Sequence, residues 1–158
     1  MVPTEPLRIV TFHLNQVGDL LFSLPALASL RAGFPGAHIT AVVRPSLTSL
    51  LRPSDLVDSI IERARGGLLA KGRLIWRLRR EKFHIAVSFS QAEECVLLSR
   101  FSGAAVRAGF DGGHFASAFT IRTEKAGPPS TMNNLRLVRA LGCPVVQDTY
   151  VGLVKLTQ

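Results

Sequence analysis

Residues 8–27 read RIVTFHLNQVGDLLFSLPAL. An apolar run rich in β-branched and aromatic side chains comes first, a short polar turn ending in Gly18-Asp19 follows, and apolar residues then recur at helical spacing. This pattern predicts a buried strand over 8–14 that leads directly into a helix over 19–33. Gly18 allows a tight turn and the close approach of a ligand, and Asp19 stands where a helix cap belongs.

Strands and helices alternate along the rest of the chain. We expect strands at 38–43, 57–62, 83–89, 106–110 and 118–121, and helices at 46–51, 68–82, 92–101 and from 131 or 133 to 141. Alternation at this spacing implies right-handed crossovers between parallel strands. The sequence therefore predicts an α/β protein with a Rossmann-like parallel sheet and helices on both faces.

The composition is that of one basic domain. The chain has 158 residues, of which 47% are apolar, and a net charge of +8 with a pI near 10.7, so we expect an anionic partner. Neither a membrane span nor a signal peptide is evident, which favours a cytoplasmic protein. Cys95 and Cys143 lack the spacing of metal ligands, and we expect reduced, buried thiols and no metal site.

Polar residues follow three of the expected strands, at 15–19, at 90–91 and at 111. Ligands of open α/β sheets bind outside the carboxyl ends of the strands, so these positions are candidates for substrate binding. Two of them have structural alternatives, because Asp111 precedes a glycine in an ordinary turn and Asp19 can serve as a helix cap alone. The candidates are Asn15, Gln16, Gly18, Asp19, Ser90, Gln91 and Asp111.

A basic segment covers residues 63–82. Its expected helix is amphipathic, with an apolar face that we assign to Leu69, Leu74, Ile75, Trp76 and Leu78. The charges are either a solvated face or a contact with an anionic ligand or membrane surface, worth about 1 kcal/mol per well-placed basic residue. Nucleic acid is disfavoured, because one Trp and one Tyr cannot build an aromatic platform. The basic candidates for binding are Arg63, Arg65, Lys71 and Arg73.

Several landmarks in order carry a family resemblance. They are Gly18-Asp19-Leu20, Leu24-Pro25-Ala26-Leu27, Phe34-Pro35-Gly36-Ala37, residues 97–104, Ala108-Gly109-Phe110-Asp111 and residues 134–142. Over residues 8–144 the chain resembles the ADP-heptose:lipopolysaccharide heptosyltransferases of glycosyltransferase family 9. Those enzymes have the GT-B architecture of two Rossmann-like domains, and the resemblance is to the N-terminal one. It implies an acceptor-side domain at 1–144, followed at 145–158 by a tail or the start of a linker to a donor-binding domain.

The resemblance also implies a function. The chain would be the acceptor-side half of a glycosyltransferase, inactive alone, that moves a sugar from a nucleotide-sugar such as ADP-heptose to a lipopolysaccharide-core or related glycan. In that family the aspartate of the Gly-Asp turn is the proposed general base, which makes Asp19 the catalytic candidate. No cofactor is implied, the donor binds mainly to the second domain, and the acceptor is an anionic glycolipid reached peripherally at the inner face of the inner membrane. The alternative is a non-catalytic glycan- or partner-binding module.

Two histidines do not support a hydrolase. His13 lies near the end of the first strand, where a hydrogen-bonded histidine is the simpler interpretation, and His114 lies in a glycine-rich turn. Neither has the acidic partner and nucleophile of a catalytic triad. The first turn also lacks the GxGxxG and GxxxxGK patterns of nucleotide-binding loops.

Overall fold

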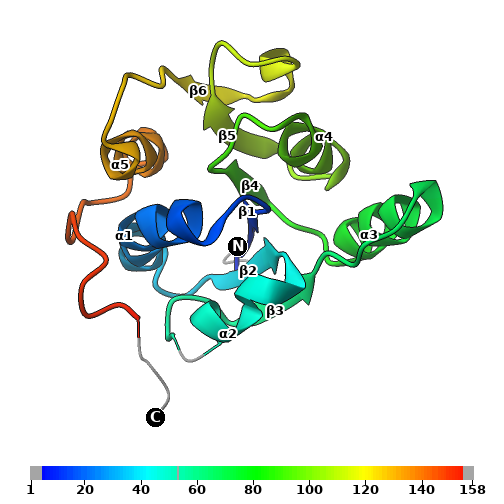
Figure 1. Cartoon of the computed structure of the whole chain (residues 1–158), viewed down its shortest axis with the longest axis horizontal. Helices are drawn as coiled ribbons and strands as arrows, with labels where there is room; N and C mark the ends of the chain where they lie inside the picture. Colours follow the sequence, from blue (N-terminus) through cyan, green and yellow to red (C-terminus); the bar gives the residue numbers. More distant parts are fainter. Residues whose placement is uncertain (1–4, 53, 155–158) are drawn as a thin grey trace.

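The computed structural model describes residues 5–52 and 54–154, and it contains a six-stranded sheet in the order β3-β2-β1-β4-β5-β6 (Figure 1). Every neighbouring pair of strands is parallel. The strands are β1 (Arg8–His13), β2 (His38–Val43), β3 (Ser59–Glu62), β4 (Ile85–Ser88), β5 (Val106–Phe110) and β6 (Ile121–Thr123). The helices are α1 (Val17–Gly33), α2 (Thr48–Leu51), α3 (Leu68–Arg80), α4 (Glu93–Phe101) and α5 (Ser130–Ala140), with short 3-10 turns η1 (Pro45–Leu47) and η2 (Ala116–Ala118). The Rossmann-like prediction is confirmed.

Helices cover both faces of the sheet, and each face has its own apolar core. On one face α1, α2 and α5 pack over side chains such as Ile9 and Ile39, while on the other α3 and α4 pack over Val10 and Phe12. Ile9 and Val10 are consecutive and point to opposite faces, as strand geometry requires. Strands buried on both sides explain the continuous apolar runs in the sequence.

Several boundaries differ from the prediction by one to three residues, and two of these differences bear on the candidate site and on the edge of the sheet. Helix α1 begins at Val17 with Gln16 as its N-cap residue, so Asp19 is the third residue of the helix and takes part in capping through its side chain only. The last strand is β6 at Ile121–Thr123 instead of 118–121, because residues 116–118 form the 3-10 turn η2. Thr120 then bonds the backbone of Arg107, which sets the register of β6 on β5.

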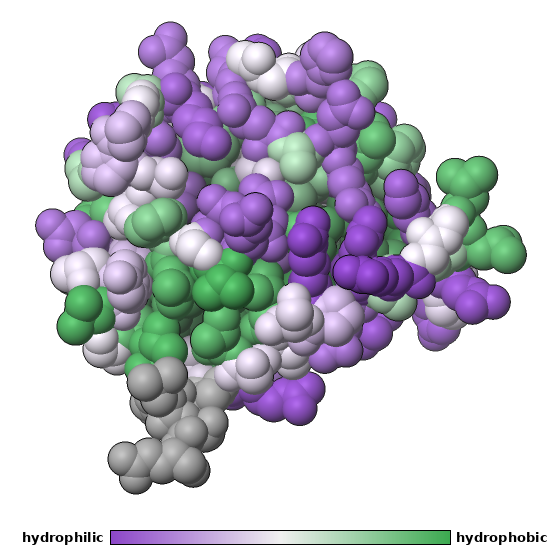
Figure 2. All heavy atoms as spheres, viewed as in Figure 1, coloured by the Kyte–Doolittle hydropathy of each residue, from purple (hydrophilic) through white to green (hydrophobic). Residues whose placement is uncertain are grey.

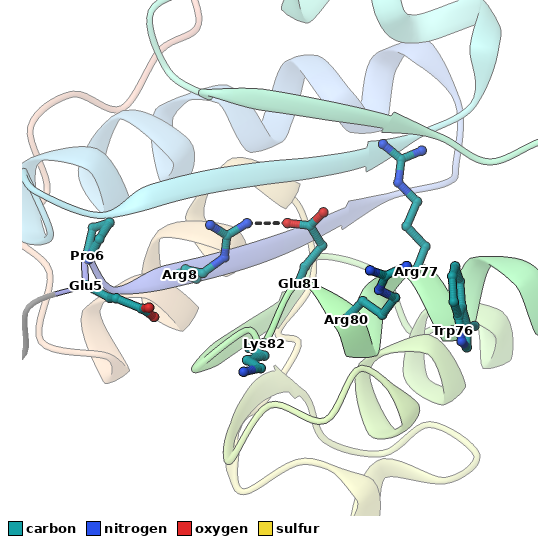
Figure 3. A pocket seen from close by; sticks show the side chains of 8 residues that line it. All are labelled: Glu5, Pro6, Arg8, Trp76, Arg77, Arg80, Glu81 and Lys82. Atoms are coloured by element: carbon teal, nitrogen blue, oxygen red, sulfur yellow. Dashed lines mark hydrogen bonds and ion pairs between the residues drawn. The ribbon is translucent and has the colours of Figure 1, made fainter.

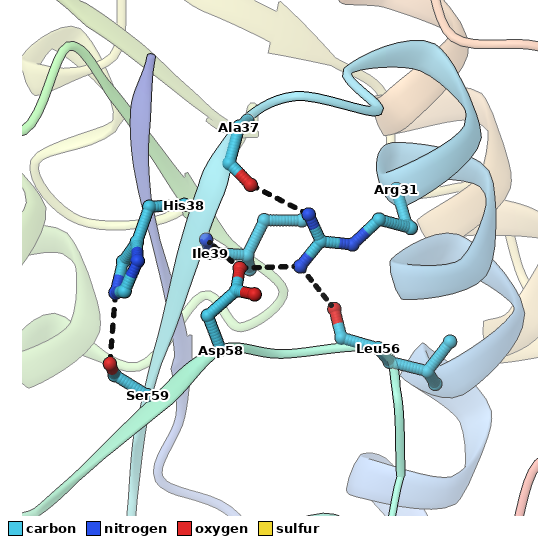
Figure 4. A network of polar contacts seen from close by, with 7 residues as sticks. All are labelled: Arg31, Ala37, His38, Ile39, Leu56, Asp58 and Ser59. Carbon is cyan, nitrogen blue, oxygen red and sulfur yellow. Dashed lines mark hydrogen bonds and ion pairs between the residues drawn. The ribbon is translucent and has the colours of Figure 1, made fainter. Parts of the chain in front are cut away.

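A polar network fastens α1 to the β2–β3 edge of the sheet (Figure 4). Arg31 donates to the Ala37 carbonyl at 2.6 Å and to Asp58 Oδ2 at 2.6 Å, and the same carboxylate oxygen accepts the Ile39 N–H at 2.8 Å. Burial opposes the charge on Asp58, but the bonds from Arg31 and Ile39 outweigh it and lower the pKa of that carboxyl. The network fixes where β3 joins the sheet.

The segment after α5 lies along α1. Val146 N–H donates to Ser29 Oγ at 3.3 Å, the Tyr150 ring meets Phe22 edge-on, and Leu153 packs against the apolar core to which α1 contributes. The described part of the expected tail, residues 145–154, therefore rests on the domain, and residues 155–158 lie outside the described residues. Among the residues described, no helix combines the length and apolar character needed to cross a bilayer.

Candidate functional site

The order of the strands creates a switch point between β1 and β4. The chain runs outward from β1 to β2 and β3 on one side and from β4 to β5 and β6 on the other, so the connections leave the sheet in opposite directions here. Ligands of doubly wound sheets bind in the crevice outside the carboxyl ends of the strands at this point. Asn15, Gln16 and Asp19 line a recess here with Phe89 and Ser90, and its volume of about 10 Å³ holds about one water.

Asp19 stands at the mouth of this recess. Its side chain is exposed, and its Oδ2 accepts the N–H of Gln16 at 3.2 Å, which closes a capping box at the start of α1. No donor in the described part of the chain bonds its other carboxylate oxygen. The carboxylate therefore caps the helix with one oxygen and presents the second to solvent at the switch point.

Gly18 is the second residue of α1, and the turn does not require a glycine there. Its φ lies outside the left-handed region, and an added Cβ would meet only the Phe22 ring at 4.0 Å. The expectation that Gly18 permits a tight turn is therefore wrong, since helical geometry alone accounts for its backbone. What the missing side chain leaves is open space beside the N-terminus of the helix.

Asn15 and Ser90 meet across the switch point. The Asn15 amide donates to Ser90 Oγ at 2.9 Å, and that hydroxyl oxygen also accepts the N–H of Ala92 at 3.0 Å next to α4. The two residues therefore tie the end of β1 to the end of β4. They form one wall of the recess. A ligand there would bind through the hydrogen-bonding groups of Asn15 and Ser90 that these bonds leave unused.

Gln91 and Asp111 lie further along the same edge. Gln91 Nε2 donates to the Asp111 carbonyl at 2.8 Å, while Asp111 Oδ1 accepts the Gly112 N–H at 3.0 Å and faces Arg122 at 3.5 Å. The Asp111 carboxylate is thus engaged in its own turn, in line with the structural alternative. Neither residue lines the recess of Asp19.

The basic candidates do not converge on the recess. Arg63 donates two hydrogen bonds to Glu94, at 2.7 and 2.8 Å, so its charge is matched within the domain. Arg65 and Lys71 are exposed, and Arg73 lines a separate hollow beside Ile61. Sequence analysis did not single out Glu94, because a partner 31 residues away leaves no local signal.

His13 is buried beneath the recess and is not an acid–base group. Its Nε2 lies 2.9 Å from Thr11 Oγ1, its Nδ1 lies 3.1 Å from Ser23 Oγ, and its ring stacks on Phe89 at 5.4 Å. Burial lowers the pKa of His13 to about 3. The interpretation as a hydrogen-bonded histidine is confirmed, and the ring is a neutral floor of the site.

Because His13 is buried, we expect the free energy of unfolding to depend on pH. The unfolded chain protonates His13 near pH 6.5, whereas the folded protein resists protonation down to a pKa of about 3. The unfolded state therefore binds more protons in this range, and the free energy of unfolding should fall by about 1.4 kcal/mol per unit as the pH drops below about 6.5. Urea unfolding at several pH values between about 4.5 and 7 measures this fall in the free energy of unfolding. This range lies above the pH values at which the lowered pKa of Asp58 changes the stability. His13→Gln should remove that slope, and an identical slope in the variant would contradict the assignment.

Comparisons with known proteins identify the fold. No protein-family model matches the chain, and no curated protein matches it. A glycosyl transferase family 9 protein from Veillonella parvula has a TM-score of 0.80 at 22% identity, over 96% of this chain and 45% of that one. E. coli heptosyltransferase WaaC, solved with ADP-2-deoxy-2-fluoro heptose, has a TM-score of 0.75 at 17% identity, over 92% and 52%. E. coli ADP-heptose lps heptosyltransferase II has a TM-score of 0.75 at 17% identity, over 96% and 47%.

These likenesses confirm the predicted resemblance at the level of the fold. The chain shares the α/β architecture of glycosyltransferase family 9 structures and spans about half the length of each of them.

Proposed function

We propose that this chain is the acceptor-side half of a glycosyltransferase with Asp19 as its general base. The observation that supports this most strongly is the exposed carboxylate of Asp19 at the β1–β4 switch point, with one oxygen held by the Gln16 N–H and the other open. The fold likeness to heptosyltransferases, one of them solved with ADP-2-deoxy-2-fluoro heptose, supports a nucleotide-sugar such as ADP-heptose as the donor.

The proposed reaction is an inverting transfer. The acceptor hydroxyl oxygen attacks the anomeric carbon, a new glycosidic C–O bond forms, and the bond to the nucleoside diphosphate breaks with its electron pair on the phosphate. The hydroxyl proton passes to the open oxygen of Asp19. The bond from Gln16 to the other oxygen holds the carboxylate in place during this step.

The donor is proposed to bind mainly to a second domain. A recess of about 10 Å³ has no room for a nucleotide, so a facing surface would have to complete the crevice. The net charge of +8, with Arg65, Lys71 and Arg73 exposed, supports an anionic acceptor such as a lipopolysaccharide-core glycolipid, met peripherally at the inner face of the inner membrane. The Arg63 charge is already matched by Glu94 and contributes less.

One observation favours a second candidate function. The recess beside Asp19 has a volume of about 10 Å³, so this domain by itself offers a contact surface for a saccharide or a partner and no room for a donor beside the candidate base. A glycan- or partner-binding module without turnover fits that arrangement.

A transfer assay separates the two candidates. The polypeptide that contains this chain is incubated with labelled ADP-heptose and a soluble inner-core saccharide, and the product is followed by mass spectrometry. The proposed function predicts a saccharide heavier by one sugar. Saturable binding of the saccharide with no product would favour the binding module.

Gly18→Ala should separate stability from activity. The added methyl group contacts only Phe22 at 4.0 Å, so the free energy of unfolding should stay within about 1 kcal/mol of the original or rise, because alanine favours helices. The same methyl group occupies the space beside Asp19, and we expect the acceptor KM to rise about tenfold. Gly36→Ala, at a loop position with open space, is the matched control. An unchanged KM would show that the acceptor does not approach Gly18.

A further inference from the structure

Helix α3 extends from one side of the body (Figure 1) and exposes the one tryptophan of the chain. Of its 13 residues only Leu78 is buried, whereas Leu68, Leu69 and Trp76 are 88%, 81% and 61% exposed. The sequence-based expectation that Leu69 and Trp76 share one apolar face with Leu78 is therefore wrong. Figure 2 shows strongly hydrophilic side chains gathered between the centre of the molecule and this side. Trp76 is thus open to a ligand from solvent.

A hollow of about 640 Å³ lies beside the C-terminal end of α3 (Figure 3). Trp76 and Arg80 lie at one end of the hollow and Glu5 at the other. Between them, the wall includes Arg8, the first residue of β1, and Lys82, in the turn before β4. Pockets that bind small molecules have volumes of this size, about 300–1,000 Å³. The hollow is thus large enough for a ligand of several linked groups.

The side chains of the hollow leave an excess of positive charge. Arg8 forms an ion pair with Glu81, so these two charges match. Three further cations and one further carboxylate line the hollow: Arg77, Arg80 and Lys82 against Glu5. Within the described residues none of these three cations forms a salt bridge, and Arg80 lies over the Trp76 ring at 4.7 Å. The negative end of the α3 dipole offsets about half a charge, so most of the excess remains.

The backbone of Lys82 is a second, independent observation. Its φ of 53° lies in the left-handed region, which favours glycine and is uncommon for other residues. Helices often have a glycine directly after the C-cap, and Lys82 holds that position after Glu81. Because strained backbone at non-glycine residues concentrates at ligand-binding sites, a lysine here indicates a use for its ammonium group in the hollow.

The hollow and the recess of Asp19 lie at opposite edges of the sheet. Arg8 begins β1 and Lys82 precedes β4, so the hollow adjoins the amino ends of these strands, whereas the recess adjoins their carboxyl ends. At about 3.3 Å per residue, the length of β1 separates the two by roughly 17 Å. A ligand in the hollow is therefore neither the donor nor the acceptor of the proposed sugar transfer.

We propose that this hollow binds a soluble polyphosphate, either free or as the phosphate chain of a nucleotide. The guanidinium groups of Arg77 and Arg80 can each donate paired hydrogen bonds to phosphate oxygens, and the Lys82 ammonium adds a compact charge. Linked phosphates suit three separate cations better than a single phosphate does, because each cation can contact a different phosphate group. The exposed Trp76 ring borders the same space and offers a stacking surface to the base of a nucleotide. The site goes beyond the proposed sugar transfer and does not depend on it.

The test titrates the 158-residue chain with sodium tripolyphosphate at constant ionic strength and without magnesium. Isothermal titration calorimetry follows the binding, together with the emission of Trp76, the only tryptophan in the chain. We expect a single saturable site and a change in Trp76 emission, and neither with sodium sulfate. Titration with ATP distinguishes the two sources of the phosphates. Base stacking on Trp76 should make ATP bind about tenfold more tightly than tripolyphosphate, whereas equal or weaker binding of ATP indicates a free polyphosphate.

Variants of the lining separate a built site from general attraction to a basic chain. Lys82→Gly removes a charge where the backbone favours glycine, so the free energy of unfolding should stay the same or rise while tripolyphosphate binds about fivefold more weakly. Arg80→Gln should weaken binding about tenfold. Arg139→Gln removes an exposed charge from α5 and is the matched control, which should bind normally.

Two results would overturn the proposal. One is the absence of saturable binding of tripolyphosphate. The other is equal weakening by Arg139→Gln and Lys82→Gly, which would show that the anion is attracted to the net charge of the chain and not to the hollow. Because the readout is binding alone, either result leaves the proposed sugar transfer untouched.

Discussion

Asp19→Asn should lower the rate of sugar transfer by about 10²–10⁴-fold and leave the protein folded. The substituted amide has no basic oxygen to take the acceptor proton, and loss of a general base has an effect of this size. The amide oxygen can still accept the Gln16 N–H that Asp19 accepts at 3.2 Å, so the capping box persists. Product formation with labelled donor, together with urea unfolding of the same sample, measures both effects.

Two further variants make this result specific. Asp19→Ala removes the base and the cap together and should add a stability loss of about 1 kcal/mol to the same loss of activity. Asp148→Asn changes an exposed carboxylate after α5, and the polypeptide that carries it should transfer sugar at the rate of the unsubstituted polypeptide. If Asp19→Asn retains full activity, Asp19 is a cap and nothing more.

Gly109→Ala should destabilise the protein by about 3 kcal/mol. Gly109 lies in β5, and an added Cβ would come within 2.3 Å of the Phe119 ring. Phe119 is only 5% exposed, so its ring has little space to move, and overpacking of a buried site has a cost of this order. The measurement is the midpoint of urea unfolding for the variant and the original chain.

A second-site change tests the cause of that loss. Phe119→Leu shortens the side chain that the new methyl group meets, so adding Gly109→Ala to it should cost less than about 1 kcal/mol. The same penalty in both backgrounds would show that the contact with Phe119 is not responsible.

The fold could be predicted because its signals are local. The apolar run of β1 and the helical spacing of α1 adjoin in the sequence, and the alternation of elements implies a parallel sheet. The connection from β5 to β6 was harder to predict. Phe119 fills the space that Gly109 leaves, the chain turns through η2 to place it there, and β6 starts three residues later than expected. Nothing in the residues around 118 shows this, because the cause is a contact with another strand.

The positions of the candidate site residues in the fold were predictable to a similar degree, while their roles remain proposals. Asp19 follows the first strand, so its position at the carboxyl edge is implied by the sequence. The bond between Asn15 and Ser90 and the pair of Arg63 with Glu94 depend on which strands become neighbours, and periodicity does not give that order. Trp76 was misplaced for a related reason, because helical spacing defines two apolar faces on α3 without showing which one meets the sheet.

The central claim is that the β1–β4 switch point binds a carbohydrate acceptor beside Asp19. Its most direct test is NMR of the ¹⁵N-labelled 158-residue chain during titration with a soluble inner-core saccharide. The claim predicts that the largest saturable changes in backbone amide shifts fall at residues 15–19 and at Ser90, and that Gly18→Ala weakens them. Saturable changes confined to other surfaces, with residues 15–19 unaffected, would contradict it.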